Sequence, residues 1–228
     1  MTRRTNARLA GIAYLLYIAA AFPAMLLSSR ATSGDGMAAK LAGLALHATD
    51  VRLAAVLSLI GCCCALVLAV TLYALTREQD RDLALLALTA RVAEGVTGAA
   101  SIPITLGLLA LATAAGTDTP DPRAAGAIGA FVLAQPWLIG ATFFAVGSTL
   151  FAYLLLRGRI VPVALAWLGV LASVLLVVLL PGQLAGFIKG PVLDFMWLPA
   201  LVFEVTLALW LLIKGVAMPL NREASKTP

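Results

Sequence analysis

The chain has 228 residues, of which 62% are hydrophobic and only 12% are charged, and its mean hydropathy is +1.01. Soluble domains carry about twice that share of charged residues, so the composition excludes a soluble protein with an apolar core and a polar surface. The net charge of +5 does not indicate a nucleic-acid partner, because the Lys and Arg residues lie in short clusters without interleaved aromatics.

Six apolar runs are long enough to cross the hydrocarbon core of a bilayer. They occupy approximately residues 9–28, 53–76, 83–114, 127–156, 160–186 and 195–217. The first run follows a basic N-terminus as in a signal peptide, but it is too long and no clean cleavage site follows, so we predict an uncleaved span. The sequence therefore predicts an all-α, polytopic membrane protein: one domain over residues 1–228, built as a bundle of six transmembrane helices with short loops.

Two of the connections have patterns of their own. In "SRATSGDGMAAKLAGLALHATDVR", Asp35 is a candidate helix cap, and four apolar residues gather on one side: Met37, Leu41, Leu44 and Leu46. This pattern predicts a short interfacial helix in the first external loop, and an irregular polar connection stays open as the alternative. In "DTPDPR", residues 118–123, Pro120 and Pro122 predict a turn.

The distribution of cations predicts the topology. If the N-terminus is inside, the cytoplasmic segments hold ten cations: Arg3, Arg4, Arg8, Arg77, Arg81, Arg157, Arg159, Lys214, Arg222 and Lys226. The external segments then hold five: Arg30, Lys40, Arg52, Arg123 and Lys189. Cytoplasmic loops are enriched in Lys and Arg, so we expect a multi-pass protein of the bacterial inner membrane with both termini in the cytoplasm.

Three charged residues lie near the centres of predicted spans: Arg91 and Glu94 in the third, and Glu204 in the sixth. A charge at a span centre costs roughly 2.5 to 3.5 kcal/mol on insertion scales, so such residues usually face a bundle interior and find partners. Arg91 and Glu94 are three residues apart, which places them on one helix face where they can pair. At 1.5 Å per residue they lie roughly 12 and 16 Å deep, and Glu204 roughly 15 Å from the same side. We therefore predict a buried cluster of these three residues.

The residues around the predicted cluster are small or aromatic. One stripe of the third span is made of Arg91, Glu94, Gly95, Gly98, Ser101, Ile102 and Thr105, and one face of the sixth span of Trp197, Ala200, Glu204 and Ala208. Small residues favour close helix contact or a wet crevice. The candidate residues to line a cavity at this level are Tyr14, Tyr17, Gly98, Gln135 and Trp197.

Several kinds of site are excluded or disfavoured. The single histidine, His47, lies outside the spans, which excludes an intramembrane bis-His haem, a His-rich metal site and a Ser/His protease. Cys62, Cys63 and Cys64 are consecutive in an apolar run, about 100° apart around a helix, so they cannot converge on one metal ion. No phosphate-binding glycine-rich loop is present either. We expect no metal, no cofactor and no enzymatic activity; a membrane enzyme acting on lipid or quinone is the weakest hypothesis.

Two functional interpretations of the cluster stay open. In the first, the protein binds or moves a small ligand or a proton at Arg91, Glu94 and Glu204, because two carboxylates sharing one arginine form a group that titrates. In the second, it is a structural or regulatory partner of another membrane protein, and the cluster only fixes helix packing.

The chain resembles a bacterial integral membrane family catalogued as domain of unknown function 4386. Four segments carry the resemblance: "RLAGIAYLLYI", "LALLALTARVAEG", "YLLLRGRIVPVALAWLGVL" and "LPALVFEVTLALWLLIKGV". It extends from about Arg8 to Val216, and its most specific parts are the residues that match Arg91, Glu94 and Glu204. The resemblance implies six spans and no established activity.

Overall fold

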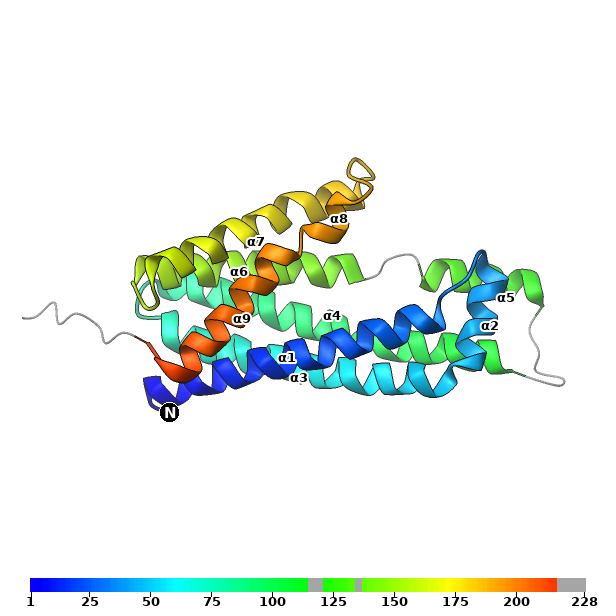
Figure 1. The fold of residues 1–228 in the computed structure, drawn as a ribbon, viewed down its shortest axis with the longest axis horizontal. Coiled ribbons are helices and arrows are strands. Elements are labelled where there is room, and N and C mark those ends of the chain that lie inside the picture. The colour runs from blue at the N-terminus through cyan, green and yellow to red at the C-terminus, as the bar shows by residue number, and fades with distance from the viewer. Residues whose placement is uncertain (115–120, 134–136, 217–228) are drawn as a thin grey trace, which may run out of the picture. The chain divides into compact units, whose positions relative to one another are not determined.

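The computed structural model describes residues 1–114, 121–133 and 137–216, and every regular element within these ranges is a helix (Figure 1). The helices are α1 (Arg3–Ala31), α2 (Met37–Leu46), α3 (Ala48–Thr76), α4 (Arg81–Thr113), α5 (Pro122–Val132), α6 (Trp137–Arg157), α7 (Val163–Leu184), α8 (Val192–Phe195) and α9 (Leu198–Ile213). The predicted all-α fold is confirmed. A bilayer favours this class because a helix satisfies its own backbone hydrogen bonds where no water is present.

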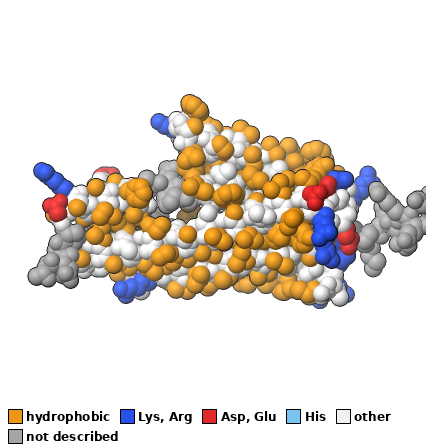
Figure 2. Space-filling model, turned by 180° about the vertical axis from the view of Figure 1, so that it is seen from behind, with side chains coloured by type: hydrophobic (Ala, Val, Ile, Leu, Met, Phe, Trp, Pro, Cys, Tyr) orange, Lys and Arg blue, Asp and Glu red, His pale blue; other side chains and the backbone are white. Residues whose placement is uncertain are grey.

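Five stretches are long and apolar enough to cross a membrane: α1, α3, α4, the stretch Pro122–Arg157 and α7. The sixth predicted span corresponds to α9, which is apolar but has 16 residues and is shorter than residues 195–217. Its large side chains are exposed on one side, as in α7, where Leu171 and Val178 are 64% and 63% exposed. Figure 2 shows hydrophobic side chains over most of the visible surface, as expected of helices that face lipid. The chain is therefore a multi-pass membrane protein.

The fourth predicted span, residues 127–156, falls within the stretch Pro122–Arg157, which is long and apolar enough to cross a membrane. The structure describes this stretch as α5, which ends at Val132, and α6, which begins at Trp137, and residues 134–136 lie outside the described residues. Asp121 caps α5 by accepting the backbone N–H groups of Arg123 and Ala124 at 3.1 and 3.0 Å. The dipeptide at the end of "DTPDPR" thus begins a helix, because proline at the first helical position has no N–H to lose.

The predicted short helix between the first two spans is present as α2, so this connection is not irregular throughout. Asp35 does not cap it: the N-cap is Gly36, whose φ of 86° suits glycine, and no side chain caps this end. α2 packs against α5 so closely that a methyl group on Gly129 would lie 2.8 Å from the Met37 sulfur. These two helices lie side by side in Figure 1.

The chain forms two compact units. Unit 1 comprises residues 1–14, 67–90 and 145–228, and unit 2 comprises residues 15–66 and 91–144. The prediction of a single domain stays a prediction.

In unit 1, α7 packs on α9, and a methyl group on Gly169 of α7 would lie 2.4 Å from the Phe203 ring. The beginning of α1 reaches α9 at Gly11, next to Leu212. In unit 2, a small core joins Ala31, Leu44, Val51, Leu108 and Leu109, so that the ends of α1 and α4 pack with α2 and the start of α3.

Charged side chains gather at the helix ends of unit 1, at the right-hand end of Figure 2. Arg3 pairs with Glu78 at 2.5 Å, and Arg157 pairs with Asp80 at 3.0 Å. Asp80 also accepts the N–H of Leu83 at the start of α4. That backbone hydrogen bond, together with Arg157, lowers the pKa of Asp80.

Candidate functional site

The third span carries a buried ion pair within one helix. In α4, an Arg91 guanidinium nitrogen lies 2.8 Å from Oε2 of Glu94, and the two side chains are 1% and 9% exposed. Residues three apart in a helix share a face, so the sequence spacing alone brings these groups together. Arg91 is among the largest fully buried side chains of the described chain.

The second oxygen of the same carboxylate has a partner from another helix. The Tyr17 hydroxyl, on α1, donates a hydrogen bond of 2.9 Å to Oε1 of Glu94. Each carboxylate oxygen therefore has one polar partner, a guanidinium on one side and a phenol on the other. Hydrogen bonds to an ionised group are shorter and stronger than those between neutral groups, so this geometry suits an ionised Glu94.

Aromatic rings surround the Arg91 guanidinium. Its central carbon lies 4.8 Å from the centre of the Phe144 ring on α6 and 5.9 Å from the centre of the Tyr17 ring. Both distances are within the range of a cation–π interaction, which is worth about 2 kcal/mol or more when desolvated. Arg91 thus links α4 to α1 and to α6, all within unit 2.

Phe144 contacts Arg91 in the structure and was not among the candidate site residues of the sequence analysis. It lies in "ATFFAVG", where two phenylalanines are adjacent, and the structure buries Phe144 to 7% exposure but leaves Phe143 at 38%. The signal available in the sequence was an aromatic residue in the fourth span. It did not show which of the two rings turns toward Arg91, because hydropathy does not fix the rotation of a helix.

Small residues on the same face of α4 meet α3. A methyl group on Gly98 would lie 3.1 Å from the Cys62 sulfur, and one on Gly95 would lie 3.5 Å from the Cys62 carbonyl oxygen. On α6, a methyl group on Gly140 would lie 3.0 Å from the Thr97 hydroxyl of α4. The glycines of α4 and α6 thus allow close helix contact one turn beyond the ion pair.

The remaining predicted site residues lie elsewhere. Glu204, on α9, is only 6% exposed, but it belongs to unit 1, whereas Arg91 and Glu94 belong to unit 2. The meeting of the three charged groups therefore stays a prediction from their depth in the spans. Tyr14 is 3% exposed in unit 1, and Trp197 is the N-cap residue of α9. Gln135 lies outside the described residues.

The side chains of Arg91, Glu94 and Tyr17 offer two kinds of chemistry: exchange of protons and a permanent positive charge. A carboxylate and a phenol both exchange protons, and the guanidinium stays charged. Within the ranges that the structure describes, no three His, Cys, Asp or Glu side chains come together in a way that could hold a metal ion.

Comparison with known proteins gives one match. The model of a family described as a domain of unknown function (DUF4386) matches residues 9–215, nearly the whole chain. Neither the curated proteins nor the solved structures contain a match.

Proposed function

Because the chain belongs to the DUF4386 family, whose description names no activity, we propose a function from the site itself: a membrane protein that binds and moves a proton at Glu94. The supporting observation is the buried carboxylate held between a guanidinium and a phenol. Intramembrane ionisable residues with named partners usually mark ion or proton pathways.

The tight fit of Arg91 favours a proton over a larger ligand. Arg91 is 1% exposed and touches two aromatic rings, and both oxygens of Glu94 have partners. A proton needs no space beyond that of the carboxylate itself, whereas a larger ligand needs room that these side chains fill.

Protonation of Glu94 has a structural consequence in this proposal. A neutral Glu94 no longer balances the charge of Arg91, and a buried charge without its counter-ion is unfavourable by several kcal/mol. The guanidinium of Arg91 then loses the counter-ion that lies 2.8 Å away in the structure. Binding of one proton is thereby coupled to a change in the contacts of Arg91 with α1 and α6.

A second candidate function has an observation of its own. Arg91 connects three helices through its ion pair and its two ring contacts, which is the behaviour expected of a residue that fixes helix packing. In this alternative the protein is a structural or regulatory partner of another membrane protein, and Glu94 stays ionised throughout.

Proton flux into proteoliposomes tests the proposal. The purified protein is reconstituted with a pH-sensitive dye inside, and a potassium diffusion potential drives protons inward. We expect flux with the wild-type protein, at least a tenfold loss with Glu94→Gln, and no loss with Glu78→Gln, whose carboxylate is 53% exposed and pairs with Arg3 at a helix end. The Glu78 variant controls for removal of one carboxylate.

A second variant keeps the test decisive if Glu94→Gln folds poorly. Tyr17→Phe retains the ring beside Arg91 and removes only the hydroxyl that contacts Glu94. We expect this variant to fold and to change the pH dependence of the flux. Flux equal to that of empty liposomes with wild-type protein, or full flux with a folded Glu94→Gln, would overturn the proposal and favour the structural alternative.

A further inference from the structure

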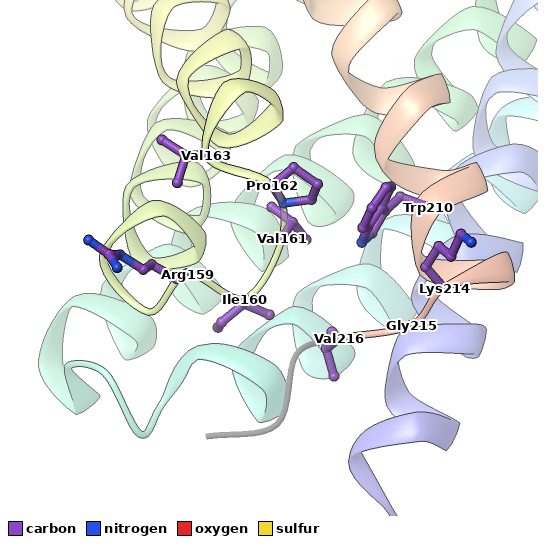
Figure 3. Close-up of a pocket in the computed structure, with 9 residues that line it drawn as sticks. All are labelled: Arg159, Ile160, Val161, Pro162, Val163, Trp210, Lys214, Gly215 and Val216. Carbon is purple, nitrogen blue, oxygen red and sulfur yellow. The ribbon is translucent and has the colours of Figure 1, made fainter. Parts of the chain in front are cut away.

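A pocket of about 420 Å³ lies in unit 1, among the end of α6, the start of α7 and the end of α9 (Figure 3). Its deeper wall is apolar, with Ile160 and Val161 only 2% and 4% exposed. Arg159, Trp210 and Lys214 also line it. The pocket is separate from the Arg91 site and takes no part in the proposed proton function.

The chain builds this pocket from two helix ends. α6 closes with a Schellman motif, in which the N–H of Ile160 donates to the Leu155 carbonyl at 3.0 Å and Arg159 has a φ of 47°. α9 closes at Gly215, which has a φ of 74° and donates to the Trp210 carbonyl at 3.1 Å. Carbonyls at both helix ends therefore have backbone partners, and the side chains of Arg159 and Lys214 determine the charge at the mouth of the pocket.

Arg159 and Lys214, the two cations of the pocket, differ from nearby arginines in their ion pairs. At the same end of unit 1, Arg3 and Arg157 each form an ion pair with a carboxylate. Arg159 and Lys214 are exposed and form no ion pair with any residue that the structure describes. Within the part of the chain that the structure describes, no carboxylate pairs with the two positive charges of the pocket.

Figure 3 shows how these side chains lie. Trp210 faces Pro162 and Val161, with its indole nitrogen on the side of Val161. Arg159 and Lys214 lie on opposite sides of the pocket, and their charged ends point outward. Both have long flexible stems, so each guanidinium or ammonium group reaches an anion seated at the mouth by rotation about side-chain bonds.

We propose that this pocket binds the phosphate headgroup of an anionic phospholipid. The phosphate lies between Arg159 and Lys214, the Trp210 N–H donates a hydrogen bond to it or to the adjacent ester, and the first carbons of the lipid lie on Ile160 and Val161. Tryptophan concentrates at the level of the headgroups, and basic pockets between transmembrane helices at the cytoplasmic end bind anionic headgroups. The pocket lies at the end of the bundle that carries most of the cations, which is the predicted cytoplasmic end.

Native mass spectrometry of the full chain in detergent tests the proposal, with phosphatidylglycerol and phosphatidylcholine as probes. We expect phosphatidylglycerol to bind more tightly. The double variant Arg159→Gln/Lys214→Gln should bind phosphatidylglycerol about 30-fold more weakly, which corresponds to about fivefold for each surface cation removed. The matched control is Arg77→Gln/Arg81→Gln, which removes two exposed cations outside the pocket, Arg77 just after the end of α3 and Arg81 at the start of α4.

A third variant examines the tryptophan. Trp210→Phe keeps an aromatic wall and removes the N–H, so we expect about tenfold weaker binding of phosphatidylglycerol with unchanged thermal stability.

Three outcomes would overturn the proposal. The first is equal loss of binding in the pocket variant and the Arg77/Arg81 control, which would indicate a diffuse surface charge effect. The second is displacement of the lipid by inorganic phosphate at millimolar concentration, which would indicate a site for a free anion. The third is equal affinity of the wild-type protein for the two lipids.

Discussion

Removal of the Glu94 charge alone should destabilise the protein more than removal of the Glu94 and Arg91 charges together. Glu94→Gln keeps an oxygen for the Tyr17 hydroxyl but removes the negative charge that lies 2.8 Å from Arg91. Arg91→Met removes the positive charge and retains an unbranched apolar side chain against Phe144. The double variant removes both charges and keeps the approximate volume of both side chains.

The magnitude follows from the burial of the pair. Side-chain exposures of 1% and 9% place both charges out of water, and removal of one partner from such a pair typically costs 3 to 5 kcal/mol. Replacement of both partners by neutral groups of similar volume is often close to neutral. The loss of the ring contacts of Arg91 adds about 1 to 2 kcal/mol to the double variant. We therefore expect the double variant to be about 2 to 3 kcal/mol more stable than Glu94→Gln alone, so the effects of the two single changes should be far from additive.

A double-mutant cycle tests this expectation. The free energy of unfolding is measured in mixed micelles of one detergent composition for the wild type, the two single variants and the double variant. The control is the same cycle at Arg3 and Glu78, whose side chains are 26% and 53% exposed. An exposed pair contributes about 1 kcal/mol at most, so its coupling should be small. Additive effects at Arg91 and Glu94, within about 0.5 kcal/mol, would refute the view that this pair is a buried and mutually dependent unit.

Two further predictions concern unit 1. Gly169→Ala should lower the free energy of unfolding by about 1 to 3 kcal/mol, because the added methyl group would lie 2.4 Å from the Phe203 ring. In the same unfolding assay Gly107→Ala should be neutral or stabilising, since nothing lies within 4 Å of its added methyl group, and equal effects of the two changes would contradict the packing of α7 on α9. Asp80 has a pKa lowered by the N–H of Leu83 and by Arg157, so its contribution to stability is present above its unfolded pKa and is lost as the pH falls through the lowered value. The melting temperature of Asp80→Asn should therefore change less than that of the wild type when the pH is lowered below about 4, and parallel melting curves would contradict this.

The helix positions were predictable because the bilayer constrains them strongly. An apolar run long enough to cross lipid has to be helical, and the predicted second span, residues 53–76, ends at the same residue as α3. Hydropathy does not locate the residue that begins a helix. Asp35 was the candidate cap of the helix between the first two spans, but Gly36 holds that position.

Of the contacts around Arg91, only the one with Glu94 was predictable, because both residues lie on the same helix. Helix geometry brings Arg91 and Glu94 together from their spacing alone. Tyr17 was named as a candidate, but its bond to the carboxylate depends on how α1 is rotated against α4, and Phe144 depends likewise on the rotation of α6. Hydropathy gives the depth of a residue in a span but not the direction of its side chain, so contacts between helices came only from the structure.

A change at Tyr17 distinguishes the two functions considered for this site, because its hydroxyl is expected to contribute little to folding and directly contacts Glu94, the proposed proton-binding residue. Hydrogen bonds between membrane helices average about 0.6 kcal/mol, since the unfolded chain in the membrane also finds partners. Loss of the Tyr17 hydroxyl should therefore leave a folded protein whose Arg91 still has Glu94 and the Phe144 ring beside it. If the cluster only fixes helix packing, the Tyr17→Phe variant should behave like the wild type. If Glu94 exchanges a proton, the lost hydrogen bond removes a stabilising partner of the ionised carboxylate, so flux shifts toward higher pH while stability changes by less than about 1 kcal/mol.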